Sequence, residues 1–276
     1  TPFVVAIFYT MQKQLTNTYT PLEVSVSMHI VPTIALSVFL VIYPYLPNKS
    51  FLVLGGLSGL INAISFILLT KAYSKDALSV IAPLRGITPI VVASIEPLVF
   101  TSIMYNETLL LASVLVAVGI YIIFYEDSIV KHFKDLFNPG PLFGLFSAVV
   151  IAFAVLVDRT VLVTYSIHPL TYTFYVSFFT LFWLLIYTAI SGKSIQETII
   201  KTQDTIRIGA LRTLTLSLGL GLLSLVSGSL MNILWQLNIV ITVIIGGRLI
   251  GEENTKRRII GAVIIVLAVI LSIYTA

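Results

Sequence analysis

The sequence lacks cysteine entirely and has little charge. Of its 276 residues, none is Cys and only 10% are Asp, Glu, Lys or Arg. The absence of cysteine excludes disulfides, thiolate metal sites and cysteine nucleophiles. Soluble globular domains have roughly a quarter of their residues charged, so the composition excludes that class as well.

Apolar residues take the place of the missing charge. They make up 58% of the chain, and the mean hydropathy is +1.04. Long unbroken runs such as LLLASVLVAVGIYIIFY (109–125) argue against a β-barrel, whose strands are short and alternate in polarity. The composition therefore predicts an all-α integral membrane protein.

A helix that crosses a membrane needs about 20 apolar residues. The sequence has ten such segments, and the longest connections, 126–140 and 191–204, are too short for a soluble domain. We therefore expect ten transmembrane helices, at 1–18, 22–46, 51–70, 77–104, 108–125, 140–163, 169–190, 206–223, 228–249 and 258–276.

The basic residues are distributed unevenly over the loops. The net charge is +4, but most basic residues lie in short loops between apolar runs, where lysine and arginine usually set membrane orientation. We therefore expect no nucleic-acid partner. Loops after even-numbered segments hold only Lys49, which predicts an N-terminus on the outer side. Loops after odd-numbered segments hold ten basic residues: Lys71, Lys75, Lys131, Lys134, Lys193, Lys201, Arg207, Lys256, Arg257 and Arg258.

Motifs for catalysis, cofactors and metals are absent from the sequence. It contains no His-Glu-x-x-His, no Gly-x-Ser-x-Gly and no Gly-x-x-x-x-Gly-Lys. The three histidines, His29, His132 and His168, are too scattered in the sequence to indicate a metal site. We expect no enzyme, no cofactor and no metal.

The two halves of the chain resemble each other. AIFYTMQKQLTNTYTPLEV (6–24) aligns with AVLVDRTVLVTYSIHPLTY (154–172) at an offset of 148. MYNETLLLASVLVAVGIYIIFY (104–125) aligns with LIGEENTKRRIIGAVIIVLAVILSIY (249–274) at offsets of 145 to 149. The pattern predicts a duplicated five-helix unit.

Five helices in each unit oblige the second copy to enter the membrane from the opposite side. We expect two inverted repeats, 1–125 and 140–276, joined by a linker at 126–139, with the start of the first helix truncated. Inverted repeats are characteristic of secondary transporters, which bind substrate near the midplane between the repeats.

With this organisation, the chain resembles EamA-type transporters of the drug/metabolite transporter superfamily. The resemblance rests on Pro97, Glu107 and Gly119 in the first half and on Gly251-Glu252 and Gly261 in the second. The second half departs from the pattern because 228–249 contains no proline.

The resemblance implies a multi-pass transporter with both termini in the cytoplasm, in the inner membrane of a prokaryote. That orientation is opposite to the one given by the loop charges. Both remain open, although both place the two termini on the same side.

Ionisable residues inside spans should face protein or cavity water, because exposure to lipid costs about 2.5–3.5 kcal/mol or more. Arg85 and Glu96 lie in 77–104, too far apart along the helix to pair directly. Arg85 meets either an anionic substrate or a carboxylate from another helix. Glu96 is either a proton carrier or a structural group near a helix end.

Three prolines, Pro83, Pro89 and Pro97, interrupt the same span. Each removes a backbone donor, so the helix must bend or open. A broken helix beside a substrate site fits transporter mechanics, and simple curvature is the alternative.

Other polar residues complete the candidate site. Asp158 and His29 are candidate proton carriers, with core packing the alternative for His29. Arg159 directly follows Asp158, so the two side chains point about 100° apart and cannot both face one partner, and the alternative for Arg159 is that it reaches the membrane interface. The remaining candidates for substrate contact, alongside Arg85, are equally able to make hydrogen bonds between helices: Tyr9, Lys13, Asn62, Asn232, Trp235 and Gln236.

The sequence therefore predicts a secondary transporter of a small polar or amphiphilic metabolite, working by alternating access with proton coupling or exchange. The alternatives are an intramembrane enzyme acting on a lipid-linked substrate and a non-transporting scaffold. The expected partners are a small-molecule substrate, the lipid bilayer and a second copy of the chain, docked through the fifth and tenth helices.

Overall fold

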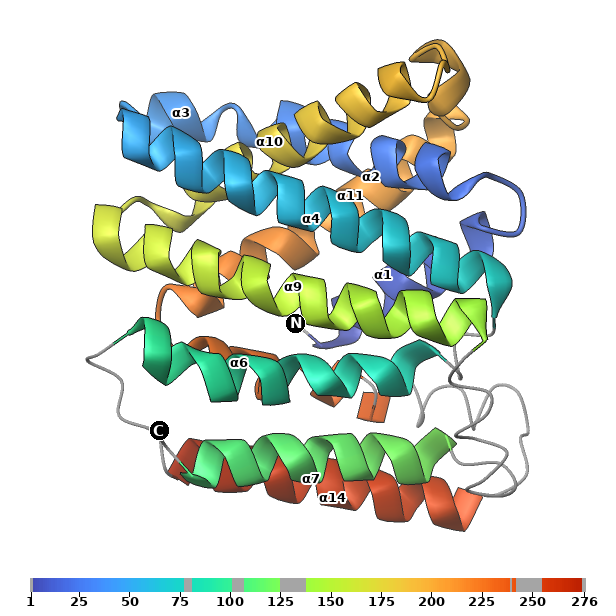
Figure 1. Ribbon diagram of the computed structural model, residues 1–276, viewed down its shortest axis with the longest axis vertical. Coiled ribbons are helices and arrows are strands. Elements are labelled where there is room, and N and C mark those ends of the chain that lie inside the picture. Colours follow the sequence, from blue (N-terminus) through green and yellow to red (C-terminus); the bar gives the residue numbers. More distant parts are fainter. Residues whose placement is uncertain are drawn as a thin grey trace.

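The computed structural model describes residues 2–76, 81–100, 107–124, 138–238, 240–241 and 255–274. All regular structure in these ranges is helical (Figure 1). The first half contains α1 (Pro2–Leu15), α2 (Pro21–Leu36), α3 (Phe39–Ile42), α4 (Lys49–Lys75), η1 (Ala82–Gly86), α6 (Ile87–Val99) and α7 (Glu107–Phe124). The second half contains α9 (Pro139–Tyr165), α10 (Pro169–Ile190), η2 (Gln196–Thr198), α11 (Thr202–Leu223), α12 (Gly228–Trp235) and α14 (Thr255–Tyr274).

Each of the ten expected spans overlaps at least one of these helices. The span 169–190 coincides with α10, whereas 22–46 is divided into α2 and α3. The linker expected at 126–139 falls outside the described ranges up to residue 137, as does the end of 228–249 beyond residue 241.

Among the described residues, five helices are long and apolar enough to cross a membrane. They cover Pro21–Ile42, Lys49–Lys75, Pro139–Tyr165, Pro169–Ile190 and Thr202–Leu223. Two shorter apolar stretches, Glu107–Ile122 and Ile260–Ser272, accompany them. These elements give the molecule the dimensions of a multi-span membrane protein.

Local sequence signals determine where several helices begin. At α2, the Thr20 side chain accepts a hydrogen bond from the Glu23 backbone N–H, and the Glu23 carboxylate accepts one from Thr20 N. This capping box satisfies two N–H groups that the helix leaves unpaired. At α4, Asn48 Oδ1 accepts from Phe51 N at 2.8 Å. Such caps explain why these helices start sharply after short polar loops.

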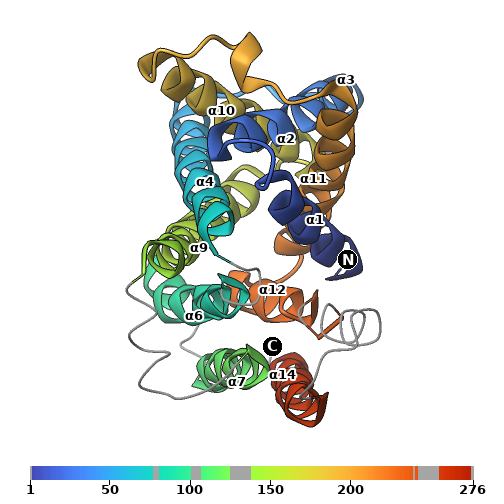
Figure 2. The same cartoon turned by 90° about the vertical axis from the view of Figure 1, so that its right-hand side faces the viewer.

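The helices run side by side around a common centre (Figure 2). In that view α4 and α9 lie on one side and α1 and α11 on the other, with α2 and α10 above and α6 and α12 below. The most extensive packing joins α4 to α9 and α7 to α14, and α2 also packs against α10 and α11. Helices from the two halves therefore alternate around the centre.

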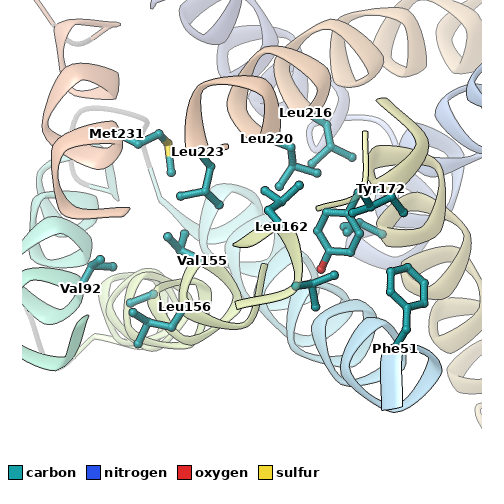
Figure 3. Close-up of a cluster of buried hydrophobic side chains, with 14 residues drawn as sticks. Phe51, Val92, Val155, Leu156, Leu162, Tyr172, Leu216, Leu220, Leu223 and Met231 are labelled. Carbon is teal, nitrogen blue, oxygen red and sulfur yellow. The ribbon is translucent and has the colours of Figure 1, made fainter. Parts of the chain in front are cut away.

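The largest buried apolar cluster lies between the halves (Figure 3). It brings together Phe51 of α4, Val155 of α9, Tyr172 of α10, Leu220 of α11 and Met231 of α12. Burial of apolar side chains contributes roughly 25 cal/mol per Å² removed from solvent. The cluster therefore holds α4 of the first half against four helices of the second.

Two glycines allow close helix crossings at corresponding places in the two halves. A Cβ at Gly59 of α4 would lie 2.7 Å from the carbonyl carbon of Phe179 on α10. A Cβ at Gly209 of α11 would lie 2.6 Å from Cβ of Val31 on α2. Only glycine permits backbones to approach this closely without displacement.

The span 77–104 is interrupted, as its prolines predict. Pro83 lies in the 3₁₀ turn η1, Pro89 in the first turn of α6, and Pro97 shortly before that helix ends. The hydroxyl of Thr88 donates to the Ala148 carbonyl of α9 at 3.0 Å, which ties the interruption to the second half. A mid-span 3₁₀ segment of this kind often marks a functional hinge.

The outer surface carries many large apolar side chains. Several are more than three-quarters exposed, which in water would be unfavourable but in hydrocarbon is not. They are distributed over both halves: Val41, Leu46, Leu98, Ile190 and Leu225.

Candidate functional site

Arg85 lies on the 3₁₀ turn and stacks on a tyrosine of α1. Its guanidinium carbon is 4.7 Å from the centroid of the Tyr9 ring, a cation–π geometry. Its side chain also lies close to that of Tyr73 of α4. Within the described ranges, Arg85 has no carboxylate partner, so the charge is held by aromatic faces alone.

Lys13 brings a second cation to the same place. It follows Tyr9 by four residues and therefore lies on the same face of α1. Its ammonium donates a hydrogen bond to the backbone carbonyl of Tyr73. The structure thus brings together three of the predicted residues, Arg85, Tyr9 and Lys13, around Tyr73.

Arg212 of α11 is a buried cation that the site analysis from sequence missed. Its side chain is 7% exposed, and its guanidinium carbon lies 4.2 Å from the centroid of the Phe66 ring. Its Nε has no hydrogen-bond partner. Arg212 lies near Tyr9, Arg85 and Asp158, close enough for their charges to act on it.

His29 contacts the same phenylalanine from α2. Its ring meets the Phe66 ring edge-on, with centroids 5.1 Å apart. Its Nδ1 lies 2.8 Å from the Ser25 carbonyl, an acceptor, so Nδ1 carries the proton of the neutral ring. The other nitrogen, Nε2, is buried and has no partner.

Gln12 of α1 supplies a third unpartnered group. Its Nε2 donates to Thr70 Oγ1 at 3.0 Å, and Thr70 Oγ1 lies 3.1 Å from Ser25 Oγ. These bonds fix the orientation of the amide and leave its Oε1 buried without a partner. The chain Gln12–Thr70–Ser25–His29 therefore ends in free acceptors on both sides.

Asp158 of α9 is buried and accepts hydrogen bonds from side chains of α4 and α10. Its Oδ1 accepts from the Ser58 hydroxyl and, at 2.7 Å, from the Tyr172 hydroxyl. Asn62 Nδ2 donates to the carbonyl of Ser58 at 3.0 Å. The structure therefore joins two predicted residues, Asp158 and Asn62, through Ser58.

The polar residues of α12 lie further along the same side of α11. The Asn232 amide donates to the Gly228 carbonyl at 2.8 Å, within its own helix. The Trp235 indole packs on Gly219, and its buried Nε1 has no partner. Gly219 follows Arg212 by seven residues, so Trp235 lies on the same face, about 10 Å away along the axis.

Gln236 ends α12. Its backbone N–H bonds to the carbonyl of Asn232, and its side chain is 7% exposed. Both residues are thus buried beside Trp235, at the edge of the cluster rather than at its centre.

Glu96 lies apart from this cluster and holds the turn between α11 and α12. Its carboxylate is 1% exposed and accepts from Gly228 N at 2.6 Å and from Ser229 N at 2.9 Å and Ser229 Oγ at 2.8 Å. It also pairs with Arg159, Nε to Oε1, at 3.3 Å. The carboxylate is therefore buried at a helix N-terminus rather than in water, and these contacts favour a structural role.

Arg159 holds the other side of that turn. It donates to the carbonyl of Leu223, at 3.0 Å, and to that of Val226, both at the end of α11. Its side chain thus faces protein rather than the membrane interface. We name Glu96 and Arg159 the turn clamp.

The described residues offer no site for a metal ion. Among the described residues, no three His, Asp or Glu side chains come close enough together to hold a metal ion. The chemistry available in the cluster is hydrogen bonding and charge recognition.

Comparisons with known proteins identify the family. Residues 138–274 match the EamA-like transporter family. The second half of the chain is thus EamA-like. Members of this family are membrane transporters, and this EamA-like protein is accordingly an integral, multi-pass membrane protein rather than an enzyme by family.

Solved structures show the same fold over the whole chain. One crystal structure aligns with a TM-score of 0.69, covering 100% of this chain and 98% of its own, at 10% sequence identity. At that identity the similarity concerns the fold alone. A comparison with curated protein sequences gives no match.

The residues that were not predicted as site residues differ in how clearly the sequence indicates them. Arg212 lies inside an apolar span, and the rule that selected Arg85 would have selected it too. Gln12 is indicated in the sequence only by its spacing from Tyr9 and Lys13, which puts the three on one face of the first helix. Tyr73 carries no such signal, because its importance comes from contacts between helices distant in sequence.

Proposed function

We propose that this EamA-like protein is a secondary transporter that moves a small polar metabolite by alternating access. The observation that carries the proposal is a group of buried or half-buried cations that have no carboxylate partner among the described residues: Arg85, Lys13 and Arg212. A buried charge without a partner is unfavourable unless a ligand completes it.

The packing of the helices supports an inverted repeat as the framework for this transport. Equivalent helices of the two proposed repeats, 1–125 and 140–276, contact each other: α2 with α10, α6 with α12 and α7 with α14. The unlike contact of α4 with α10 has its counterpart in that of α11 with α2. Reciprocal contacts of this kind are what a two-fold relation generates.

The glycine crossings support the same relation. Gly59 on Phe179 corresponds to Gly209 on Val31, with offsets of about 150 residues for the glycines and about 148 for their partners. Each crossing joins a helix of one half to a helix of the other, as a two-fold relation between the proposed repeats requires.

Roles for the candidate residues follow from their positions. Arg85, Tyr9 and Lys13 form one end of the proposed substrate site, and Trp235 with Asn232 and Gln236 forms the other. Asn62 supports Asp158 through Ser58. Asp158 and His29, both buried beside Arg212, are the groups we propose for proton coupling, whereas the contacts of Glu96 favour the turn clamp.

Location and assembly complete the proposal. We place the transporter in the inner membrane of a prokaryote. A homodimer through α7 and α14 would have to use their outward faces, because Gly119 of α7 already packs against Gly261 and Ile265 of α14.

Uptake by proteoliposomes tests the proposal. The purified protein should accumulate at least one labelled compound from a panel of organic acids, amino acids, sugar phosphates, nucleotide sugars and amines. Arg85→Gln should reduce that uptake by about 10-fold or more, since charge-assisted bonds contribute about 1.5–3 kcal/mol.

The matched control is Lys49→Gln, which removes an exposed cation at the start of α4. It should leave uptake unchanged. Absence of flux for every compound class would contradict transport, and full activity of Arg85→Gln would remove Arg85 from the site.

A further inference from the structure

Arg212, His29 and Gln12 together leave an unusual set of polar atoms without partners. The guanidinium of Arg212 makes a cation–π contact, and in the part of the chain that the structure describes it makes neither a hydrogen bond nor an ion pair. Buried cations in proteins are normally paired, because burial without compensation is strongly unfavourable. The missing partner of Arg212 is therefore an anion.

The geometry of Arg212 favours an oxyanion. A guanidinium presents its N–H groups in a planar fork that matches two oxygens of a carboxylate or phosphate. The guanidinium carbon of Arg212 lies 4.2 Å from the centroid of the Phe66 ring, and a ring offers no oxygen acceptor to the N–H fork. An oxyanion bound to the fork would displace no hydrogen bond or ion pair that Arg212 makes with the described residues.

The two other free atoms are acceptors. Gln12 Oε1 is free because the amide nitrogen is committed to Thr70, and His29 Nε2 is free because the ring proton is on Nδ1. Both side chains are fully buried. A ligand that satisfies them must carry a hydrogen-bond donor in addition to its oxyanion.

Charge decides between the two common donors, a hydroxyl and an ammonium. The groups around the site are Arg212, Arg85 and Lys13, opposed by Asp158, whose Oδ1 already accepts from two hydroxyls. This excess of positive charge disfavours an ammonium and favours a neutral hydroxyl.

We propose that Arg212, His29 and Gln12 form a subsite for a small hydroxylated organic anion, with the oxyanion on Arg212 and the hydroxyl on Gln12 Oε1 and His29 Nε2. The inference rests on the proposed transport function, because it specifies the substrate class of that site. The aromatic faces of Phe66 and Tyr9 would border the carbon skeleton of the ligand.

Binding in detergent tests the subsite without requiring transport. Isothermal titration with lactate, 3-phenyllactate and glycerol 3-phosphate should detect binding by at least one of them. Comparison of the two carboxylates with glycerol 3-phosphate separates carboxylate from phosphate recognition. The matched compounds propionate and 3-phenylpropionate, which lack the hydroxyl, should bind at least ~10-fold more weakly, since unpaired polar groups then remain buried. Alanine and phenylalanine should also bind at least ~10-fold more weakly.

Substitutions locate the binding. Arg212→Gln should weaken the affinity at least ~10-fold, and Arg212→Lys, which keeps the charge but loses the fork, should weaken it less. Gln12→Glu should also weaken the affinity, because it places a negative charge close to the bound anion. Arg207→Gln, which removes an exposed arginine of the same helix, should have no effect. Thermal melting of each variant distinguishes loss of the site from loss of the fold.

Several results would overturn the subsite. Among them are no binding by any of the three anions, tighter binding by the amino acids, or unchanged affinity in a folded Arg212→Gln protein. Flux of a cationic or neutral compound that is indifferent to Arg212→Gln would refute the subsite and leave transport standing. Anion binding that depends on Arg212 without any flux would refute transport and leave the subsite standing.

Discussion

Two arginines inside helices of this molecule have opposite surroundings. Arg159 has a carboxylate partner in Glu96 and two backbone carbonyls, whereas Arg212 contacts an aromatic ring and makes no hydrogen bond or ion pair with the described residues. The first therefore stabilises the fold, and the second is held in place by the fold at an energetic disadvantage. Groups of the second kind are typical of functional sites, where stability is sacrificed for binding.

This contrast predicts opposite effects of the same substitution. Arg159→Met should destabilise the protein by about 3 kcal/mol, because it leaves the Glu96 carboxylate buried without its cation. Arg212→Met should leave stability unchanged or raise it, because it removes an uncompensated charge. Thermal melting in detergent measures both. Equal destabilisation by the two substitutions would show that Arg212 has a partner in the fold.

The sequence predicted some of the site residues and not others for a physical reason. Arg85, Lys13 and Asp158 stand out because ionisable groups are costly inside a membrane, whatever their contacts. The free atoms of Gln12 and His29 are defined by which of their other atoms are bonded. That depends on Thr70 and Ser25, and no sequence pattern reveals it.

At the scale of the element, helix positions were predictable and helix interruptions only partly so. The apolar runs predicted α10 to the residue, and the prolines predicted a break in 77–104. The division of 22–46 into α2 and α3 was not predicted, although Pro32 lies inside α2. Hydropathy reports how apolar a segment is, and the pieces on both sides of a helix break are equally apolar, so the break leaves no trace in it.

Helix crossings at glycine provide a test at this scale. Gly59→Ala should destabilise the protein by about 1–3 kcal/mol, because the added Cβ would overlap the Phe179 backbone on α10. Gly56→Ala, one turn earlier on α4, is the matched control, since a Cβ there meets nothing within 4 Å. Chemical or thermal unfolding of both variants compares them. A harmless Gly59→Ala would show that α4 and α10 lie further apart.

At the scale of the whole molecule, the proposed inversion makes a prediction about sidedness. Asn17 follows the first helix of the first repeat, and Ser166 follows the first helix of the second; both are exposed. In inverted repeats, these equivalent loops lie on opposite sides of the membrane. The cysteine-free sequence allows each to be replaced singly by cysteine without background labelling.

A membrane-impermeant maleimide applied to intact cells should therefore label either Asn17→Cys or Ser166→Cys, but not both. The other should react only after permeabilisation. Whichever is labelled also decides between the orientation from loop charge and that implied by the family resemblance. Labelling of both variants from one side would rule out the inversion.

The hydrogen bonds between the halves limit which parts can move as rigid bodies. Ser65 of α4 and Ser147 of α9 each donate to the other's backbone carbonyl, at 3.1 and 2.9 Å, and the turn clamp joins α6 to the α11–α12 turn. A motion that separated the first half of the chain from the second would break all of these bonds. In the proposed alternating access, each rocking body would therefore be mixed, with α4 and α9, one helix from each proposed repeat, moving together.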